Sequence, residues 1–398
     1  MPRRFIVLAG VTLLVACTED RPGRNVLIGQ DTVDATEVAR IGELDGASEY
    51  VLGNVAAVAA DHLGTIYVVD QFGSTLRAYD NTGSYLATIA GEGEGPGELS
   101  FPRDLVFDPG DRLHVRDAFR VTSFGRRSGA PVVDSLVGTR PLPGAGSPPG
   151  MRGSSDGGRY YYPAYLYQGF ERQGYFYIGL DAAGTVVDSV HVPRLRDAGA
   201  TGRANYALND RTGLPVDGVS HAPFEPIESW SLSNDRTLYF APGNRYEIVV
   251  IRSGDTIRTV RLDSEPRRAS PSEYSDSVRA FRTRYDSIPV PIDQMRAMSQ
   301  AARTATLPEL LPEVLAIYVP PDSTLWVRRW PREGRDETSF DVLSREGVQL
   351  ATVRLPVSLL SDPQPWLADG LIVGVVADEV TEVEQVVAFR VPEIRSNR

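Results

Sequence analysis

Short apolar or alternating runs dominate the chain from about residue 52, and most of them follow a polar turn. A run such as Ile66–Val69 or Leu325–Val327 comes two to four residues after such a turn. Asp, Asn and Gly tolerate positive φ, so a turn of this composition before a β-rich run indicates a hairpin. Because the pattern recurs, it predicts an array of small sheets. The turns begin at Asp61, Asp108, Asp156, Asn234, Pro321 and Asp369.

A second turn, ending in Gly, follows about 20 residues later in every unit but the last; it ends at Gly83, Gly129, Gly184, Gly254 and Gly347. The last unit therefore has three strands, and residues 38–44 form a strand-like segment without a hairpin partner. We predict an all-β fold, a six-bladed β-propeller with four-stranded blades. Its N-terminal strand closes the last blade beside residues 385–390, which protects sheet edges. A β-sandwich is the alternative, but it does not explain the unequal turn counts.

One stretch has a helical pattern. Ser270-Pro271-Ser272-Glu273 is a capping box with Pro at the first helical position. Apolar residues then recur at helical spacing, at Tyr274, Val278, Phe281 and Tyr285 and again at Met295, Met298 and Ala302. We predict a helical insertion at 270–307 between blades 4 and 5, packed over one mouth of the ring. A structural cap is favoured over a partner-binding helix.

The N-terminal segment has the pattern of an export signal. Two Arg precede the apolar run Phe5–Val15, which is too short for a permanent membrane span. Residues 14–17, Leu-Val-Ala-Cys, resemble a bacterial lipobox, which implies cleavage after residue 16 and lipidation of Cys17. By the same resemblance, Thr18 implies sorting to the outer membrane. We predict a signal peptide at 1–16, a flexible tether at 17–35 and the propeller at 36–398; an ordinary signal peptide is the alternative.

Composition removes several classes of function. The chain of 398 residues has 41 basic side chains, all Arg, against 52 acidic ones, for a net charge of −11. Without Lys it has neither Schiff-base chemistry nor a Walker-type phosphate loop. The negative charge argues against nucleic acid as a partner. The single Cys excludes an intrachain disulfide and a Cys-rich metal site.

The first two units resemble a known repeat. The Gly-rich segment 91–102 leads into Leu105–Asp108, and with Ile66–Asp70 and Leu76–Asp80 it is similar to an NHL-type repeat. The resemblance covers about residues 52–125 and is closest to bacterial six-bladed β-propeller lipoproteins. It implies that Asp70 and Asp117 hydrogen-bond neighbouring backbone. The glutamates and Pro of the Gly-rich segment exclude phosphate binding there.

We find no catalytic or metal motif. The four His, at positions 62, 114, 191 and 221, fall in different blades without ligand spacing, and His114 is the one that the pore could include. No Gly-x-Ser-x-Gly elbow is present. We therefore expect no catalytic residues, metal or cofactor. A calcium- or zinc-dependent propeller hydrolase, lactonase or lyase is the alternative.

Two aromatic or Arg-containing segments are candidate ligand contacts. Residues 160–177 contain nine Tyr and Phe, and the part with Tyr165, Tyr167 and Phe170 is predicted as a loop because Pro163 and Gly169 interrupt it. In the fifth blade, strand alternation places Arg328 and Trp330 on one face and Arg329 on the other. Strand packing and salt bridges within the acidic body are the competing interpretations.

These observations predict a non-catalytic binding or scaffolding module in the cell envelope. Its membrane contact is the lipidated Cys17, on the periplasmic side of the outer membrane. Its partner is a protein, peptide or glycan of the envelope.

The lipid anchor is directly testable. Cys17→Ser should abolish acyl labelling and release the protein from membranes, because several acyl chains hold it there at about 0.8 kcal/mol per buried methylene. Metabolic labelling with a fatty acid, followed by membrane fractionation, measures both effects. Retention of label in the Cys17→Ser protein would contradict the prediction.

Overall fold

The computed structural model describes residues 31–117, 120–142, 150–153, 159–168, 171–181, 183–193, 203–209, 215–221, 223–262, 266–283, 292–305, 307–331, 337–378 and 380–394. The predicted signal peptide, Cys17 and residues 18–30 lie outside these ranges, as does Phe170. Within the described ranges, none of the helices combines the length and apolar character needed to cross a bilayer.

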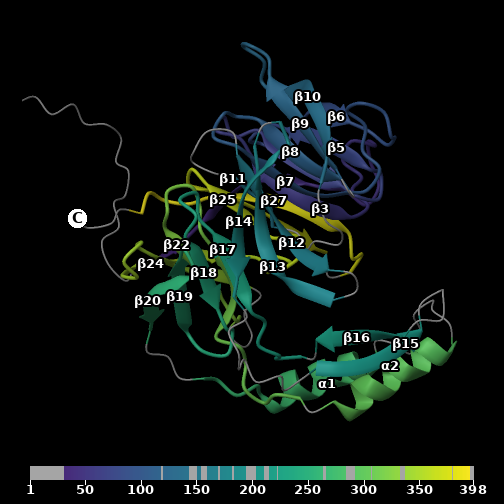
Figure 1. The fold of residues 1–398 in the computed structure, drawn as a ribbon, viewed down its shortest axis with the longest axis vertical. Helices are drawn as coiled ribbons and strands as arrows, with labels where there is room; N and C mark the ends of the chain where they lie inside the picture. Colours follow the sequence, from purple (N-terminus) through teal and green to yellow (C-terminus); the bar gives the residue numbers. More distant parts are fainter. Residues whose placement is uncertain are drawn as a thin grey trace, which may run out of the picture.

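Six antiparallel meanders form a ring of blades, as predicted (Figure 1). Blade 1 consists of β3 (Val55–Ala60), β4 (Ile66–Asp70), β5 (Thr75–Tyr79) and β6 (Tyr85–Ala90), and blade 2 of β7 (Pro102–Phe107), β8 (Leu113–Asp117), β9 (Arg120–Arg126) and β10 (Val133–Pro141). Blade 3 consists of β11 (Arg152–Gly153), β12 (Tyr160–Gln168), β13 (Glu171–Leu180) and β14 (Val186–Val192), and blade 4 of β17 (Ser229–Leu232), β18 (Leu238–Ala241), β19 (Glu247–Arg252) and β20 (Asp255–Arg261). Blade 5 contains β21 (Val314–Tyr318), β22 (Leu325–Arg329), β23 (Thr338–Leu343) and β24 (Gln349–Leu355), and blade 6 contains β25 (Trp366–Ala368), β26 (Leu371–Ala377) and β27 (Glu384–Arg390).

The N-terminal strand closes the ring. Strand β2 (Thr36–Ile41) pairs antiparallel with β27, from Thr36 opposite Arg390 to Ile41 opposite Val386. Ile41 is 1% exposed and belongs to the apolar cluster between blades 6 and 1. The predicted pairing of residues 38–44 with 385–390 is therefore confirmed, and blade 6 reaches four strands.

The folded body begins earlier than the sequence pattern indicated. Residues assigned to the tether form strand β1 (Asp31–Asp34), which pairs parallel with β24 as a fifth, outer strand of blade 5. Val33 is buried in the cluster between blades 5 and 6, and Arg354 forms an ion pair with Asp34. A single apolar residue in a polar tetrapeptide gives no sequence signal, and only the neighbouring blade makes it a strand. The boundary at residue 36 is thus corrected to 31.

Each pair of neighbouring blades encloses its own apolar cluster. The clusters between blades 1 and 2, 2 and 3, 3 and 4, 4 and 5, 5 and 6, and 6 and 1 together form the core. The Tyr-rich strand β12 contributes Tyr161 to one side and Tyr160 and Tyr162 to the other, and all three are almost fully buried. Strand packing therefore accounts for these aromatics.

The repeated aspartates stabilise turns and connectors. Asp61 accepts hydrogen bonds from the backbone N–H of Leu63 and Thr65, each at 2.9 Å, and Asp108 and Asp181 make the same pattern in their own turns. Such turns satisfy backbone donors where no strand partner exists. The recurrence of Asp in these turns therefore has a local folding cause.

Asp70 and Asp117 act on the segments that lead into each blade. Asp70, at the end of β4, accepts hydrogen bonds from the N–H of Gly53 (3.2 Å) and Asn54 (3.1 Å), just before β3. Asp117, at the end of β8, accepts one from the N–H of Ser100 (3.0 Å), just before β7. The backbone bonding that the family resemblance implied is confirmed at both positions.

The helical insertion lies between blades 4 and 5, as predicted, with α1 (Pro271–Thr283) and α2 (Ile292–Thr304). Its capping box forms: the N–H of Glu273 donates to Ser270 Oγ (3.2 Å), and the N–H of Ser270 donates to Glu273 Oε2 (2.9 Å). A hairpin between blades 3 and 4, β15 (Arg203–Asn209) and β16 (Pro215–His221), lies against α2 (Figure 1). Helix α2 therefore packs on this hairpin and α1 packs on α2, and no described residue of either helix lines the cavity at the centre of the ring.

An ion-pair network joins blades 1 and 2. Arg126, at the end of β9, donates to the fully buried carboxylate of Asp61 in the first turn of blade 1 and to Asp111 in that of blade 2 (2.6 Å). Tyr67 donates to Asp61 as well (3.0 Å). Burial, and then the nearby Asp61 carboxylate, raise the pKa of Tyr67 above its usual range. The tyrosine therefore stays a neutral donor.

Closure of the ring gives a stability prediction. Deleting residues 36–46 removes β2 with its buried Ile41, exposes the edge of β27 and should lower the free energy of unfolding by at least about 2–5 kcal/mol. Thermal unfolding and light scattering should show a lower Tm and aggregation. Val33→Ala, which weakens β1 alone, serves as the control and should leave the protein soluble. A deletion variant that melts and stays soluble like the parent would refute closure by β2.

The ion-pair network at Arg126 gives a second stability prediction. Arg126→Met should destabilise the protein by about 3 kcal/mol, because Asp61 is left buried without its cation. Arg127→Met is the matched control. The Arg127 side chain pairs with Asp134 but is 67% exposed, so we expect almost no effect on stability. Urea unfolding compares the two, and equal midpoints would contradict the prediction.

Candidate functional site

The first strands of the blades converge on a central channel. Its cavity has a volume of about 620 Å³ and is lined from all six blades, by residues that include Ala57, Val106, Met151, Asn234, Tyr318 and Trp366. Alternation along a first strand places consecutive side chains, such as Ala57 and Val58, in the clusters on either side of the blade, and the inner edge of the strand borders the channel. The channel is therefore a product of ring closure.

The aspartates at the channel have partners within the fold. Asp61 and Asp111 bind Arg126, and Asp108 accepts a hydrogen bond from His114 Nε2 (3.2 Å). Burial alone would raise the pKa of Asp108, but the hydrogen bonds from His114 and from backbone N–H groups outweigh it and hold the pKa below its usual value. Asp108 is therefore an ionised acceptor. His114 is 1% exposed and is not among the residues that line the channel.

A hydrogen bond crosses the channel. Asp104 of blade 2 accepts the backbone N–H groups of Gly150 and Met151, each at 2.7 Å, and so fixes the start of blade 3. The next residue, Arg152, donates to Gln364 of blade 6 (3.1 Å). Blades 3 and 6 are opposite each other in a ring of six, so this contact spans the channel.

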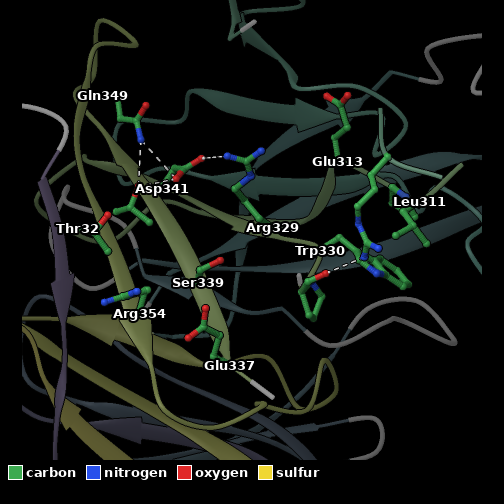
Figure 2. A pocket seen from close by; sticks show the side chains of 14 residues that line it. Thr32, Leu311, Glu313, Arg329, Trp330, Glu337, Ser339, Asp341, Gln349 and Arg354 are labelled. Carbon is green, nitrogen blue, oxygen red and sulfur yellow. Dashed lines mark hydrogen bonds and ion pairs between the residues drawn. The ribbon is translucent and has the colours of Figure 1, made fainter. Parts of the chain in front are cut away.

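A second hollow, the blade-5 cleft, has a volume of about 280 Å³ (Figure 2). At one end of its floor is Asp341, which is 1% exposed. Its carboxylate accepts hydrogen bonds from Thr352 Oγ1 (2.9 Å) and Arg329 (3.4 Å), and from the hydroxyl of Tyr246 in blade 4 (3.0 Å). Burial, and then Asp341, raise the pKa of Tyr246 above its usual range. The floor is therefore a fixed polar network on the face of blade 5.

The insertion builds the opposite wall of the cleft. Arg267 precedes α1 and Leu311 follows α2, and the N–H of Leu311 donates to the carbonyl of Arg267 (2.9 Å). Glu313 ties this wall to blade 4 by accepting the N–H of Tyr246 (2.6 Å). Trp330 completes the wall in Figure 2, and Thr32 of β1 lies on the other side.

Of the predicted contact residues in blade 5, the structure places Trp330 in the cleft but not Arg328. Arg328 is 4% exposed and donates to the carbonyls of Leu359 and Leu360 (3.0 Å to the latter). Strand β22 ends at Arg329, so alternation does not extend to Trp330, and Arg329 and Trp330 line the same cleft. The predicted placement of Trp330 on the same face as Arg328 was wrong, because it required β22 to extend one residue further.

The aromatic segment with Tyr165 and Tyr167, predicted as a loop, is instead part of a strand. Tyr165 and Tyr167 lie within β12, with Tyr165 opposite Tyr175 and Tyr167 opposite Arg172 in β13. The high strand propensity of Tyr outweighs the interruption by Pro163. Phe170 lies outside the described residues, and ligand contact by all three stays a prediction.

Sequence reasoning missed Asp341 and Arg152, and it assigned Arg329 to the face opposite Trp330. Asp341 and Arg152 are charged residues within strands, and nothing local marks them as different from other charges in the chain. In the part of the chain that the structure describes, no three His, Cys, Asp or Glu side chains gather as a metal site would require.

No protein-family model and no curated protein sequence matches the chain. Similar solved structures include a member of the DUF4221 family from Bacteroides vulgatus, 9% identical, covering 91% of this chain and 98% of that one with a TM-score of 0.48. An inferred exported protein from Bacteroides fragilis is 10% identical over 94% of this chain and 100% of its own, with a TM-score of 0.47. Virginiamycin B lyase from Staphylococcus aureus is 10% identical over 87% and 97%, with a TM-score of 0.40. At these scores, the strand pairing within this chain is what establishes the six-bladed propeller.

Proposed function

We propose that the protein is an exported lipoprotein that binds a peptide segment of another envelope protein in its central channel, without catalysis. Cys17 anchors it in the outer membrane, on the periplasmic side. Glycan is the other ligand class compatible with the sequence, and nucleic acid is not a partner.

The observation that carries this proposal is the channel itself. A volume of about 620 Å³ is within the range of about 300–1,000 Å³ that is usual for ligand pockets. Partly exposed apolar side chains such as Val106 and Trp366 line the channel together with Asn234, Gln364 and the guanidinium of Arg152. A peptide needs this combination, because its backbone requires hydrogen bonds while its side chains require apolar contact.

The charges at the channel favour binding over acid–base chemistry. A general acid or base needs a carboxyl whose proton can move at the working pH. Asp61 and Asp111 are instead paired with Arg126, and the lowered pKa of Asp108 keeps it ionised. These carboxylates hold the turns of blades 1 and 2 in place.

The anchor would keep the body close to the bilayer. Thirteen residues, 18–30, separate Cys17 from Asp31, the start of β1. Even fully extended, such a tether reaches at most about 50 Å. A ligand on an abundant envelope protein is therefore within reach.

Site-specific crosslinking tests the proposal in cells. A photoreactive phenylalanine replacing Gln364, in the channel, should form an adduct with one envelope protein. The same residue replacing Val348 is the control, because Val348 is 61% exposed in an outer turn of blade 5. Equal adducts at both positions, or none at Gln364, would overturn binding in the channel.

The competing outcome is a metal-dependent enzyme. The soluble Cys17→Ser protein should contain no stoichiometric divalent ion and should hydrolyse neither lactones nor peptides. One tightly held ion per chain, removed by chelation together with such an activity, would replace the proposal with the hydrolase or lyase alternative. Elemental analysis and activity assays before and after chelation decide between them.

A further inference from the structure

Each arginine that lines the blade-5 cleft pairs with a carboxylate. Arg329 lies 3.4 Å from Asp341, Arg354 2.8 Å from Asp34, and Arg267 2.9 Å from Glu273. An anionic ligand would have to compete with these carboxylates for the arginines. The cleft therefore disfavours an anion and favours a ligand with many hydrogen-bonding groups.

The surface of the cleft offers hydrogen-bonding side chains next to an apolar wall. Ser339 and Thr32 contribute hydroxyls, which can both donate and accept, and Gln349 contributes an amide. In Figure 2, Ser339 and Arg354 lie on one side of the hollow and Trp330 and Leu311 on the other. The Trp330 ring is braced edge-on by Phe224, with ring centroids 5.8 Å apart. This rigid indole is an apolar wall opposite a polar floor.

We propose that the blade-5 cleft binds a neutral saccharide. Sugars present hydroxyls around their edge and C–H groups on their faces, so the hydroxyls would meet Ser339 and Thr352, which Asp341 holds in place, while one face packs on Trp330. At about 280 Å³ the cleft accepts a short saccharide or the end of a longer one. This second site is independent of the channel and of the peptide ligand proposed for it.

The N-terminal strand takes part in this site. Thr32 of β1 lies opposite Thr352 of β24, and β1 adds to a blade that already has four strands. The ring is closed by β2 and does not require β1 for closure. The cleft therefore uses a strand that closure of the ring does not need, next to the segment that leads to the lipid anchor.

Titration with defined saccharides tests the proposal. Isothermal titration of the soluble Cys17→Ser protein with cellotriose, maltotriose and chitotriose should show binding of at least one, with glucuronic acid and glucosamine as charged controls that bind more weakly. Trp330→Ala should weaken binding by about tenfold or more. Ser339→Ala removes one hydroxyl from the floor without touching the wall and should weaken binding less, which keeps the test valid if Trp330→Ala unfolds.

A matched control separates the two sites. Trp366→Ala changes the channel and should leave saccharide binding unchanged, whereas Trp330→Ala should leave crosslinking from position 364 unchanged. Tighter binding of the charged sugars, equal binding by the Trp330→Ala and parent proteins, or no binding of any neutral trisaccharide at millimolar concentration would overturn the saccharide site. None of these results bears on the channel.

Discussion

The pairing of β2 with β27 is the constraint on which the other features depend. It joins two segments that are more than 340 residues apart, and it gives the last blade the strand that it lacks. Each apolar cluster of the ring lies between two blades, so a ring that opens at one point loses a cluster and exposes two blade faces. The channel has walls on all sides only because the ring is closed.

Within that frame, buried charge is used to fix turns and connectors. Arg126 forms ion pairs with two aspartates from neighbouring blades, and Asp104 holds the first residues of blade 3 through their N–H groups. A buried carboxylate is tolerated only when it is paired or hydrogen-bonded, and each of these is. The polar groups near the channel are thus mainly structural, and Arg152 and Gln364 are the ones that reach across it.

The departures from the repeat are concentrated around blade 5. Strand β1 extends the outer edge of blade 5. The two ends of the helical insertion form a wall beside the end of strand β22 in the same blade. Both additions border the same cleft. The insertion, whose helix α2 packs on the β15–β16 hairpin, forms part of this cleft at its base, and none of its described helical residues lines the channel.

The sequence alone determined the fold class, the order of the strands, the insertion and its cap, and the closure of the last blade. Those features depend on local turn chemistry and on repetition, which a single chain displays: Asp61 and Asp108 stand in equivalent turns, and Ser270 and Glu273 stand in the spacing of a capping box. The tertiary structure decided which side chains meet. That Asp31–Asp34 is a strand, that Arg328 is buried while Arg329 lines a cleft, and that Arg152 reaches Gln364 all depend on contacts between different blades. Such contacts are set by the twist and packing of whole sheets, and no local pattern of residues records them.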